Sequence, residues 1–150
     1  MSGTELGLRD VLGRRVVAGD SAEEVGKVKG FVLDRTATRV ERVHVGGRAR
    51  KAELVDWTDI DGLAGDVMMV SAGGDVHRSR DESDGEHLRG DIQILGARVL
   101  DTDGYVVGTV DDLRFDSGSG RVLGVVTDSG RIEAERIHSL GTYSLVVDPG

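Results

Sequence analysis

Apolar and polar side chains alternate in short runs along most of the chain. A period of two residues is typical of a β-strand with one buried and one exposed face. In the first half, the alternation predicts strands at residues 14–18, 25–34, 39–45, 52–57 and 66–70. In the second half, it predicts strands at residues 97–100, 105–115, 121–127, 131–134 and 143–147. Residues 6–12 fit either one helical turn or an edge segment.

Turns rich in Gly, Asp, Ser and Thr separate the predicted strands. In Asp101-Thr102-Asp103-Gly104, the glycine can take a positive φ at no steric cost, which suits a tight hairpin. The same four residues resemble the start of a calcium loop. Such a loop needs a further oxygen ligand before its glycine and a Glu at its twelfth position, where Asp112 stands. A hairpin turn is therefore favoured.

The two halves read as copies of one unit. Leu12-Gly13-Arg14-Arg15-Val16 is repeated as Leu95-Gly96-Ala97-Arg98-Val99, and Val25-Gly26-Lys27-Val28 as Val107-Gly108-Thr109-Val110. The spacing between equivalent residues is 83 at Gly13, 82 at Val28 and 77 at Ile60. The length changes fall in predicted turns, where they are tolerated. This pattern indicates a duplication.

The residues between the copies are polar. Residues 73–91 contain two apolar side chains, Val76 and Leu88, too few to offset the entropy cost of ordering the backbone. We therefore expect unit one at residues 6–72, a flexible acidic linker at 73–88 and unit two at 89–150. Aromatic residues make up only 3% of the chain, so each small core must consist of Val, Leu, Ile and Ala. Packing of the units together, or formation of a homodimer, would support such thin cores, and the sequence leaves both possibilities open.

Each unit contains Leu-Gly-x-x-Val, a polar turn, Val-Gly-x-Val, and a hydrophobic-Asp pair whose turn leads into Arg-Val. This pattern resembles the PRC-barrel family, which is named for the cytoplasmic domain of the photosynthetic reaction-centre H subunit. The family is also similar to the C-terminal domain of the ribosome maturation factor RimM. Unit one departs from the pattern at Ala22-Glu23-Glu24, where unit two has Asp103-Gly104-Tyr105. The resemblance implies an all-β protein with two small PRC-barrel-like β-barrels in tandem, used for docking or assembly, with no catalytic residues carried over.

Charge and composition narrow the function further. A net charge of −8 argues against direct nucleic-acid binding, which needs a basic surface. The absence of cysteine excludes disulfides and thiolate metal sites, and no apolar run approaches the ~20 residues that span a bilayer. The N-terminus lacks the basic and apolar regions of a signal peptide, so we expect a cytoplasmic protein without membrane insertion.

No group of residues in the sequence suggests a reaction. The histidines His44, His77, His87 and His138 lack metal-ligand spacing, and His44 fits a solvent-facing strand position. Asp111 and Asp112 are neighbours in a predicted strand, so they point to opposite faces and cannot address one substrate. We therefore expect no enzyme, no metal and no cofactor.

Four residues are candidates for contact with a partner. Arg48, Arg50 and Lys51 lie in a glycine-led basic loop that is either a solvated hairpin tip or a docking patch. Trp57 is the only tryptophan, and the copy carries Ala134 at the equivalent position. The ring is either interfacial or buried under the longer loop of unit one.

The sequence thus favours a non-catalytic module for protein–protein interaction or assembly, with a protein partner of unknown identity. The alternative is a RimM-like factor that docks to a ribosomal or RNA-processing particle through protein. A small-ligand carrier is less favoured, because it would need a pocket lined by convergent polar groups.

Overall fold

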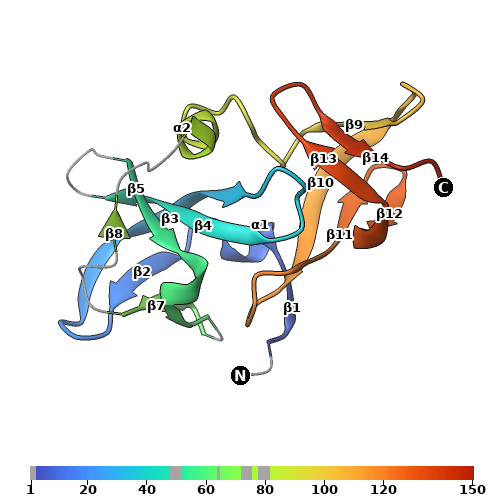
Figure 1. The fold of residues 1–150 in the computed structure, drawn as a ribbon. Helices are drawn as coiled ribbons and strands as arrows, with labels where there is room; N and C mark the ends of the chain where they lie inside the picture. The colour runs from blue at the N-terminus through green and yellow to red at the C-terminus, as the bar shows by residue number, and fades with distance from the viewer. Residues whose placement is uncertain (1–2, 48–51, 64, 72–75, 78–81) are drawn as a thin grey trace.

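The computed structural model describes residues 3–47, 52–63, 65–71, 76–77 and 82–150, which form two β-sheets lying side by side (Figure 1). The strands of unit one are β2 (Arg15–Ala18), β3 (Glu23–Leu33), β4 (Val40–Gly47), β5 (Ala52–Asp56), β6 (Ile60–Gly62), β7 (Val67–Val70) and β8 (Val76–His77). Their order in the sheet is β6-β7-β2-β3-β4-β5-β8. A short 3₁₀ helix, η1 (Trp57–Asp59), follows β5.

Unit two repeats this arrangement. Its strands are β9 (Arg98–Asp101), β10 (Val106–Asp116), β11 (Val122–Thr127), β12 (Gly130–Glu133), β13 (Ile137–Leu140) and β14 (Leu145–Val147). They run in the order β12-β11-β10-β9-β14-β13, with η3 (Ala134–Arg136) after β12. In each unit one strand pair is parallel, β2 with β7 and β9 with β14. Among the described residues, no strand pair closes either sheet at its ends.

Residue pairing confirms the duplication. Gly26 pairs with Val16 in unit one, and Gly108 pairs with Val99, the equivalent residue, in unit two. The glycines before β2 and β9, Gly13 and Gly96, have φ values of +86° and +83°. Their N–H groups donate to the carbonyl oxygens of the equivalent residues Val28 (2.9 Å) and Val110 (2.8 Å).

The two short strands β6 and β13 were not predicted. The pattern predicted a turn over residues 59–65, where β6 lies, and no strand at Ile137–Leu140. Both strands are three or four residues long and contain polar side chains, so they carry little alternation. They are held in place by antiparallel pairing with β7 and β14.

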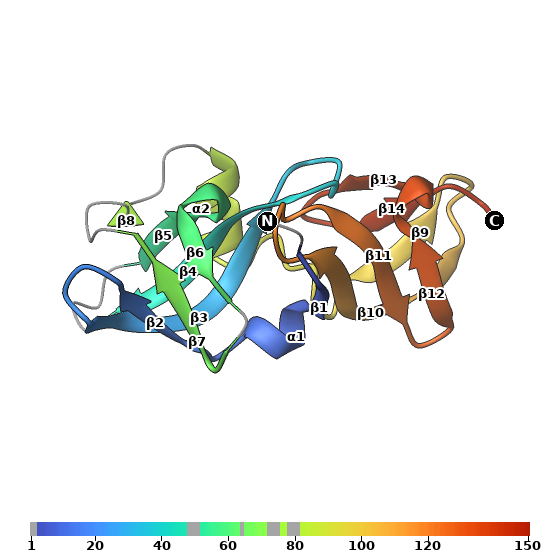
Figure 2. The same cartoon turned by 90° about the horizontal axis from the view of Figure 1, so that it is seen from below.

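The N-terminal segment crosses from one unit to the other. β1 (Glu5–Gly7) pairs with β10 of unit two, and α1 (Leu8–Val11) then leads into β2 of unit one. Leu8 and Val11 are fully buried, and Figure 2 shows β1 and α1 between the two units. Residues 6–12 therefore combine the two structures that their pattern allowed.

Part of the predicted flexible linker is helical. α2 (Glu82–Leu88) packs beside β3, and the fully buried Asp84 accepts a hydrogen bond from Arg42 Nη1 at 2.7 Å. The Nε2 atom of His87 accepts a hydrogen bond from the Leu33 N–H at 3.3 Å. The prediction of a flexible linker is wrong for these residues, because contacts with distant strands replace the missing apolar side chains.

A single hydrophobic cluster extends through both units. It contains Val16, Val43 and Met68 from unit one and Val99, Leu113 and Leu145 from unit two, all fully buried. Aliphatic side chains make up most of it, as the composition predicted. The two units therefore share one core.

Candidate functional site

The structure bears on one of the four predicted contact residues. Arg48, Arg50 and Lys51 lie outside the described residues, so their role in docking stays a prediction. Trp57 is only 5% exposed and lies where the two units meet. Its ring packs edge-on against Phe115 with the ring centroids 5.2 Å apart, and its Nε1 donates to the Ser117 carbonyl at 3.1 Å. The ring is thus used inside the chain, and it is not presented to an external partner.

Two equivalent hairpins form the contact between the units. The Val40 N–H donates to the Gly120 carbonyl, and the Val122 N–H donates to the Thr38 carbonyl, both at 2.8 Å. Because Val40 corresponds to Val122 and Thr38 to Gly120, each bond is the counterpart of the other. The contact therefore has an approximate twofold symmetry.

An aspartate holds each of these hairpins. Asp34 Oδ1 accepts hydrogen bonds from the N–H groups of Thr38 (2.7 Å) and Arg39 (3.0 Å). Asp116 Oδ2 accepts bonds from the N–H (2.9 Å) and the hydroxyl (2.7 Å) of Ser119. Partial burial raises the pKa of Asp34, but the hydrogen bonds from Thr38 and Thr36 outweigh it and leave the pKa below its usual value. The Ser119 hydroxyl likewise lowers the pKa of Asp116.

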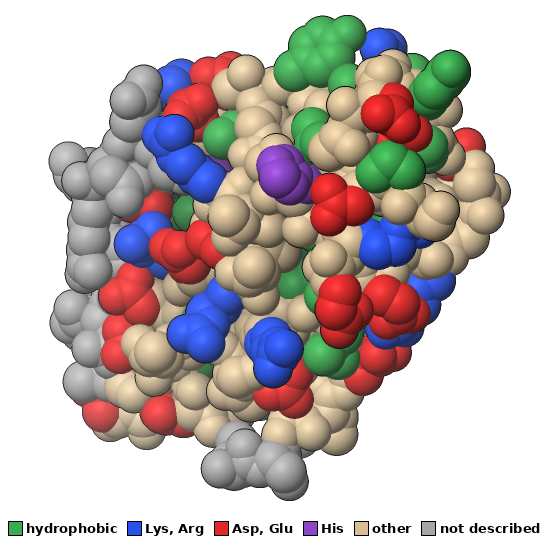
Figure 3. Space-filling view, turned by 45° about the vertical axis from the view of Figure 1, so that its right-hand side comes forward, with side chains coloured by type: hydrophobic (Ala, Val, Ile, Leu, Met, Phe, Trp, Pro, Cys, Tyr) green, Lys and Arg blue, Asp and Glu red, His purple; other side chains and the backbone are tan. Residues whose placement is uncertain are grey.

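Unit two has three large apolar side chains that are mostly exposed. Tyr105, Val106 and Tyr143 are 71%, 62% and 74% exposed. Val106 pairs with Leu100, and Leu100 pairs with Val146. We call Leu100, Tyr105, Val106, Tyr143 and Val146 the outer apolar face. Figure 3 shows hydrophobic side chains gathered at the upper end of this side of the molecule.

Strand register identifies the counterparts of these residues in unit one. Val106 pairs with Leu100 as Glu24 pairs with Val17, so Tyr105 and Val106 correspond to Glu23 and Glu24. Leu145 pairs with Val99 as Met68 pairs with Val16, so Tyr143 corresponds to Asp66. The same fold thus has carboxylates at these three positions in one copy and exposed apolar groups in the other.

A groove of about 650 Å³ lies beside Tyr143. Gly96, Thr109, Tyr143 and Ser144 contribute to its lining, as does Arg98, whose guanidinium lies 6.0 Å from the centroid of the Tyr143 ring. In unit one the equivalent arginine, Arg15, forms an ion pair with Glu24 at 3.6 Å. Where Val106 replaces Glu24, the equivalent arginine therefore lies near the ring of Tyr143, whereas Arg15 pairs with a carboxylate.

A second cavity, of about 470 Å³, lies between the sheet of unit one and the segment that leads into unit two. Lys29, Phe31 and His44 come from β3 and β4, whereas His87 and Gln93 come from the connecting segment. Burial, followed by the positive charge of Lys29, lowers the pKa of His44 below its usual value. His44 is half-buried at this cavity, and the expected solvent-facing position describes it only in part.

The sequence reasoning missed both the outer apolar face and this cavity. The alternation pattern places Tyr105, Tyr143 and Lys29 in strands or turns and gives none of them a functional role. The signal in the sequence was the comparison of the two copies. Strand register places Glu23 at the position of Tyr105, one residue before the Glu24 that the sequence pattern set against Tyr105, and Asp66 at the position of Tyr143. The sequence contains no such signal for the burial of Trp57, because its partners Phe115 and Ser117 are far away in the sequence.

None of the helices in the described part of the chain is long and apolar enough to cross a membrane.

Comparison with known proteins identifies the family. No curated protein matches the sequence significantly. The family model of the PRC-barrel domain matches residues 3–77 and again residues 90–147, which together cover most of the chain. Because the two matches together cover most of the chain, this chain belongs to the PRC-barrel family and contains two PRC-barrel domains in tandem.

Proposed function

We propose that this protein is a non-catalytic module for protein–protein interaction or assembly, and that its outer apolar face contacts a protein partner. The observation that carries the proposal is the exposure of Tyr105, Val106 and Tyr143 at positions where unit one has carboxylates. Unit one shows that the fold does not require apolar groups there. Exposed apolar side chains that gather on one face are typical of interaction sites.

The chemistry of the face suits a protein surface. Tyrosine is enriched at interface hot spots, because its ring buries a large apolar area while its hydroxyl can still find a hydrogen-bond partner. The groove beside Tyr143 would accept a side chain of the partner, with Arg98 at its wall. We propose a cytoplasmic location, which is consistent with the absence of cysteine.

The test exchanges the residues of unit two for those of unit one. Tyr105→Glu, Val106→Glu and Tyr143→Asp are combined in one variant, and partners are captured by proximity labelling in the native cell. We expect the variant to lose the partners of the wild-type protein. A control, Glu23→Gln with Asp66→Asn, changes two of the three equivalent positions of unit one and should keep the wild-type partners.

A second arm tests the basic loop by charge reversal at Arg48, Arg50 and Lys51. Loss of partners in this variant alone would move the contact surface to the loop. If neither variant changes the set of captured partners, the proposed interaction role of both surfaces is wrong. Sedimentation of the purified protein shows whether the partner is a second copy, and co-sedimentation with ribosomal particles would identify a ribosomal partner.

A further inference from the structure

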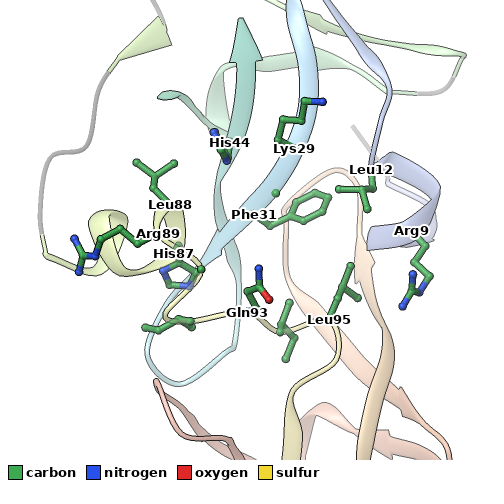
Figure 4. A pocket seen from close by; sticks show the side chains of 14 residues that line it. Arg9, Leu12, Lys29, Phe31, His44, His87, Leu88, Arg89, Gln93 and Leu95 are labelled. Carbon is green, nitrogen blue, oxygen red and sulfur yellow. The ribbon is translucent and has the colours of Figure 1, made fainter. Parts of the chain in front are cut away.

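The cavity beside β3 has an unusual distribution of charge. Its side chains include Arg9, Lys29, His44, His87, Arg89 and Gln93, and none of the described residues that line it is Asp or Glu. The whole chain, by contrast, has 27 acidic residues and a net charge of −8. Figure 4 shows Phe31 and Gln93 in the middle of the cavity, with Lys29 and His44 on one side and His87 on the other.

The positive charge of the cavity is only partly used by the protein. Lys29 forms no ion pair with a carboxylate among the described residues. Arg9 donates through Nε to a backbone carbonyl, that of Asp111, and Arg89 at the outer edge pairs with Asp91 at 3.0 Å. His87 already accepts a hydrogen bond at Nε2 from the Leu33 N–H. Among the cationic side chains that line the cavity, Lys29 is therefore the one whose charge is most available to a ligand.

The equivalent place in unit two is filled and acidic. Gly30 pairs with His44 in unit one as Asp112 pairs with Val126 in unit two. Asp111, Asp112 and Val126 are therefore the equivalents of Lys29, Gly30 and His44. Asp112 Oδ1 accepts hydrogen bonds from the N–H groups of Arg9 (3.2 Å) and Leu113 (2.8 Å). The Asp112 carboxylate also lies so close to Gly7 that a Cβ there would be 2.1 Å from Oδ2.

In unit one the same place is open. Gly30 has no side chain, and a Cβ built there would meet nothing closer than the His44 Cβ and Nδ1 atoms at 3.8 Å. Lys29 lies at a β-bulge between Val28 and Gly30, and Asp111 lies at the equivalent bulge of β10. Bulges re-aim side chains and often occur at functional sites. The two copies thus place opposite charges at one position, with open space beside only the lysine.

We propose that this cavity binds a small organic anion. Lys29 would hold its acidic head group, and the Gln93 amide would donate a hydrogen bond to it. Phe31, Leu12 and Leu95 would contact its apolar body. The volume of about 470 Å³ lies in the range typical of sites for small molecules, roughly 300–1,000 Å³. Such a ligand would touch both unit one and the connecting segment, so its binding would stabilise their packing.

The test uses the fluorescent probe 8-anilinonaphthalene-1-sulfonate, which joins a sulfonate to an apolar aromatic body. Titration of the full chain should give one saturable site and shift the NMR signals of the His44 ring protons. Lys29→Asp, which introduces the residue of unit two, should weaken probe binding roughly tenfold or more. Lys27→Asp is the matched control, because it makes the same charge change on the same strand outside the cavity.

A second comparison separates the charge from the apolar contact. N-phenyl-1-naphthylamine has the same aromatic body without the sulfonate, and it should bind roughly tenfold more weakly or worse. Gly30→Asp should also abolish binding by filling the open space, while circular dichroism verifies its fold. Absence of probe binding, equal binding of the neutral compound, or equal effects of Lys29→Asp and Lys27→Asp would each overturn the proposal. Binding at the outer apolar face would appear as insensitivity to Lys29→Asp and would leave the proposed protein contact untouched.

Discussion

Gly120 lies where the two hairpins and the only tryptophan meet. Its φ of +80° is in the left-handed region that favours glycine. A Cβ at this position would lie 2.8 Å from the Val40 carbonyl oxygen and 3.0 Å from Trp57 Cδ1. The equivalent residue of unit one is Thr38. Only the hairpin of unit two therefore lacks a side chain at this position, and this is where the indole ring packs.

Gly120→Ala should therefore destabilise the protein through both backbone strain and crowding. We expect the free energy of unfolding to fall by about 2–3 kcal/mol, measured by urea denaturation. Gly104→Ala is the control, because Gly104 has a φ of +94° with nothing within 4 Å of the built Cβ. It should cost about 1 kcal/mol, from strain alone. Equal costs for the two variants would show that crowding against Trp57 does not matter.

Trp57→Ala would introduce the residue that unit two has at this position. We expect a loss of about 3–5 kcal/mol, because a buried aromatic ring is removed from the contact between units. Trp57→Phe retains an aromatic ring but removes the Nε1 donor to Ser117, and should cost about 1 kcal/mol for the lost hydrogen bond. A cost near zero for Trp57→Ala would contradict the role assigned to the ring.

The sequence identified Trp57 as exceptional but could not place it. The comparison with Ala134 showed that one copy needs a large ring, whereas the choice between burial and exposure depended on Phe115 in the other unit. Likewise, the alternation placed Tyr105 and Val106 at the start of a strand. Their exposure depends on the folded structure, in which Tyr105 is 71% and Val106 62% exposed.

At the scale of elements, long strands were predicted well and short elements poorly. The strands β3 and β10 are 11 residues long and differ from their predicted bounds by one or two residues. α2 was missed because its stability comes from Arg42 on β4 and Leu33 on β3. These contacts join residues more than 40 positions apart, and no local pattern contains them.

Asp84→Ala tests how α2 is held. Loss of the bond from Arg42 should cost about 1–3 kcal/mol, because a hydrogen bond between charged groups is removed. Loosening of α2 should also release the bond between His87 and the Leu33 N–H, so the Leu33 amide should exchange with solvent faster. Unchanged exchange at Leu33 would show that α2 does not depend on Asp84.

The hairpin aspartates predict a dependence of stability on pH. Because the pKa of Asp34 is below its usual value of 3.8, its ionised form contributes stability above pH 3.8, and this contribution is lost as the pH falls through the lower folded value. Asp34→Asn removes this titration. The wild type should exceed this variant in stability by about 1 kcal/mol at pH 7, and the difference should shrink below pH 3.8. A constant difference from pH 7 to pH 3 would contradict this prediction.

At the scale of the whole molecule, the shared core predicts that the units unfold together. The N-terminal segment strengthens this coupling, because Glu5 on β1 pairs with Arg114 (3.2 Å) and Arg131 (3.3 Å) of unit two. Hydrogen bonds from Arg131 and Arg114 lower the pKa of Glu5 below its usual value. Both the duplication and the PRC-barrel resemblance were confirmed, whereas the sequence left open whether the units pack together.

Urea denaturation should therefore give one transition. Trp57 fluorescence reports the contact between the units, and far-UV circular dichroism reports both sheets. We expect the two signals to have the same midpoint, as in a two-state transition. A fluorescence change that is complete before the circular dichroism changes would indicate units that separate first.

The paired hydrogen bonds of Val40 with Gly120 and of Val122 with Thr38 have one more consequence. A self-complementary contact of this kind saturates once two partners have met, and it cannot propagate into a ring or a filament. Since both hairpin tips are already occupied within a single polypeptide, neither is free to recruit another chain. A larger complex of this protein would therefore have to use a surface other than these hairpin tips.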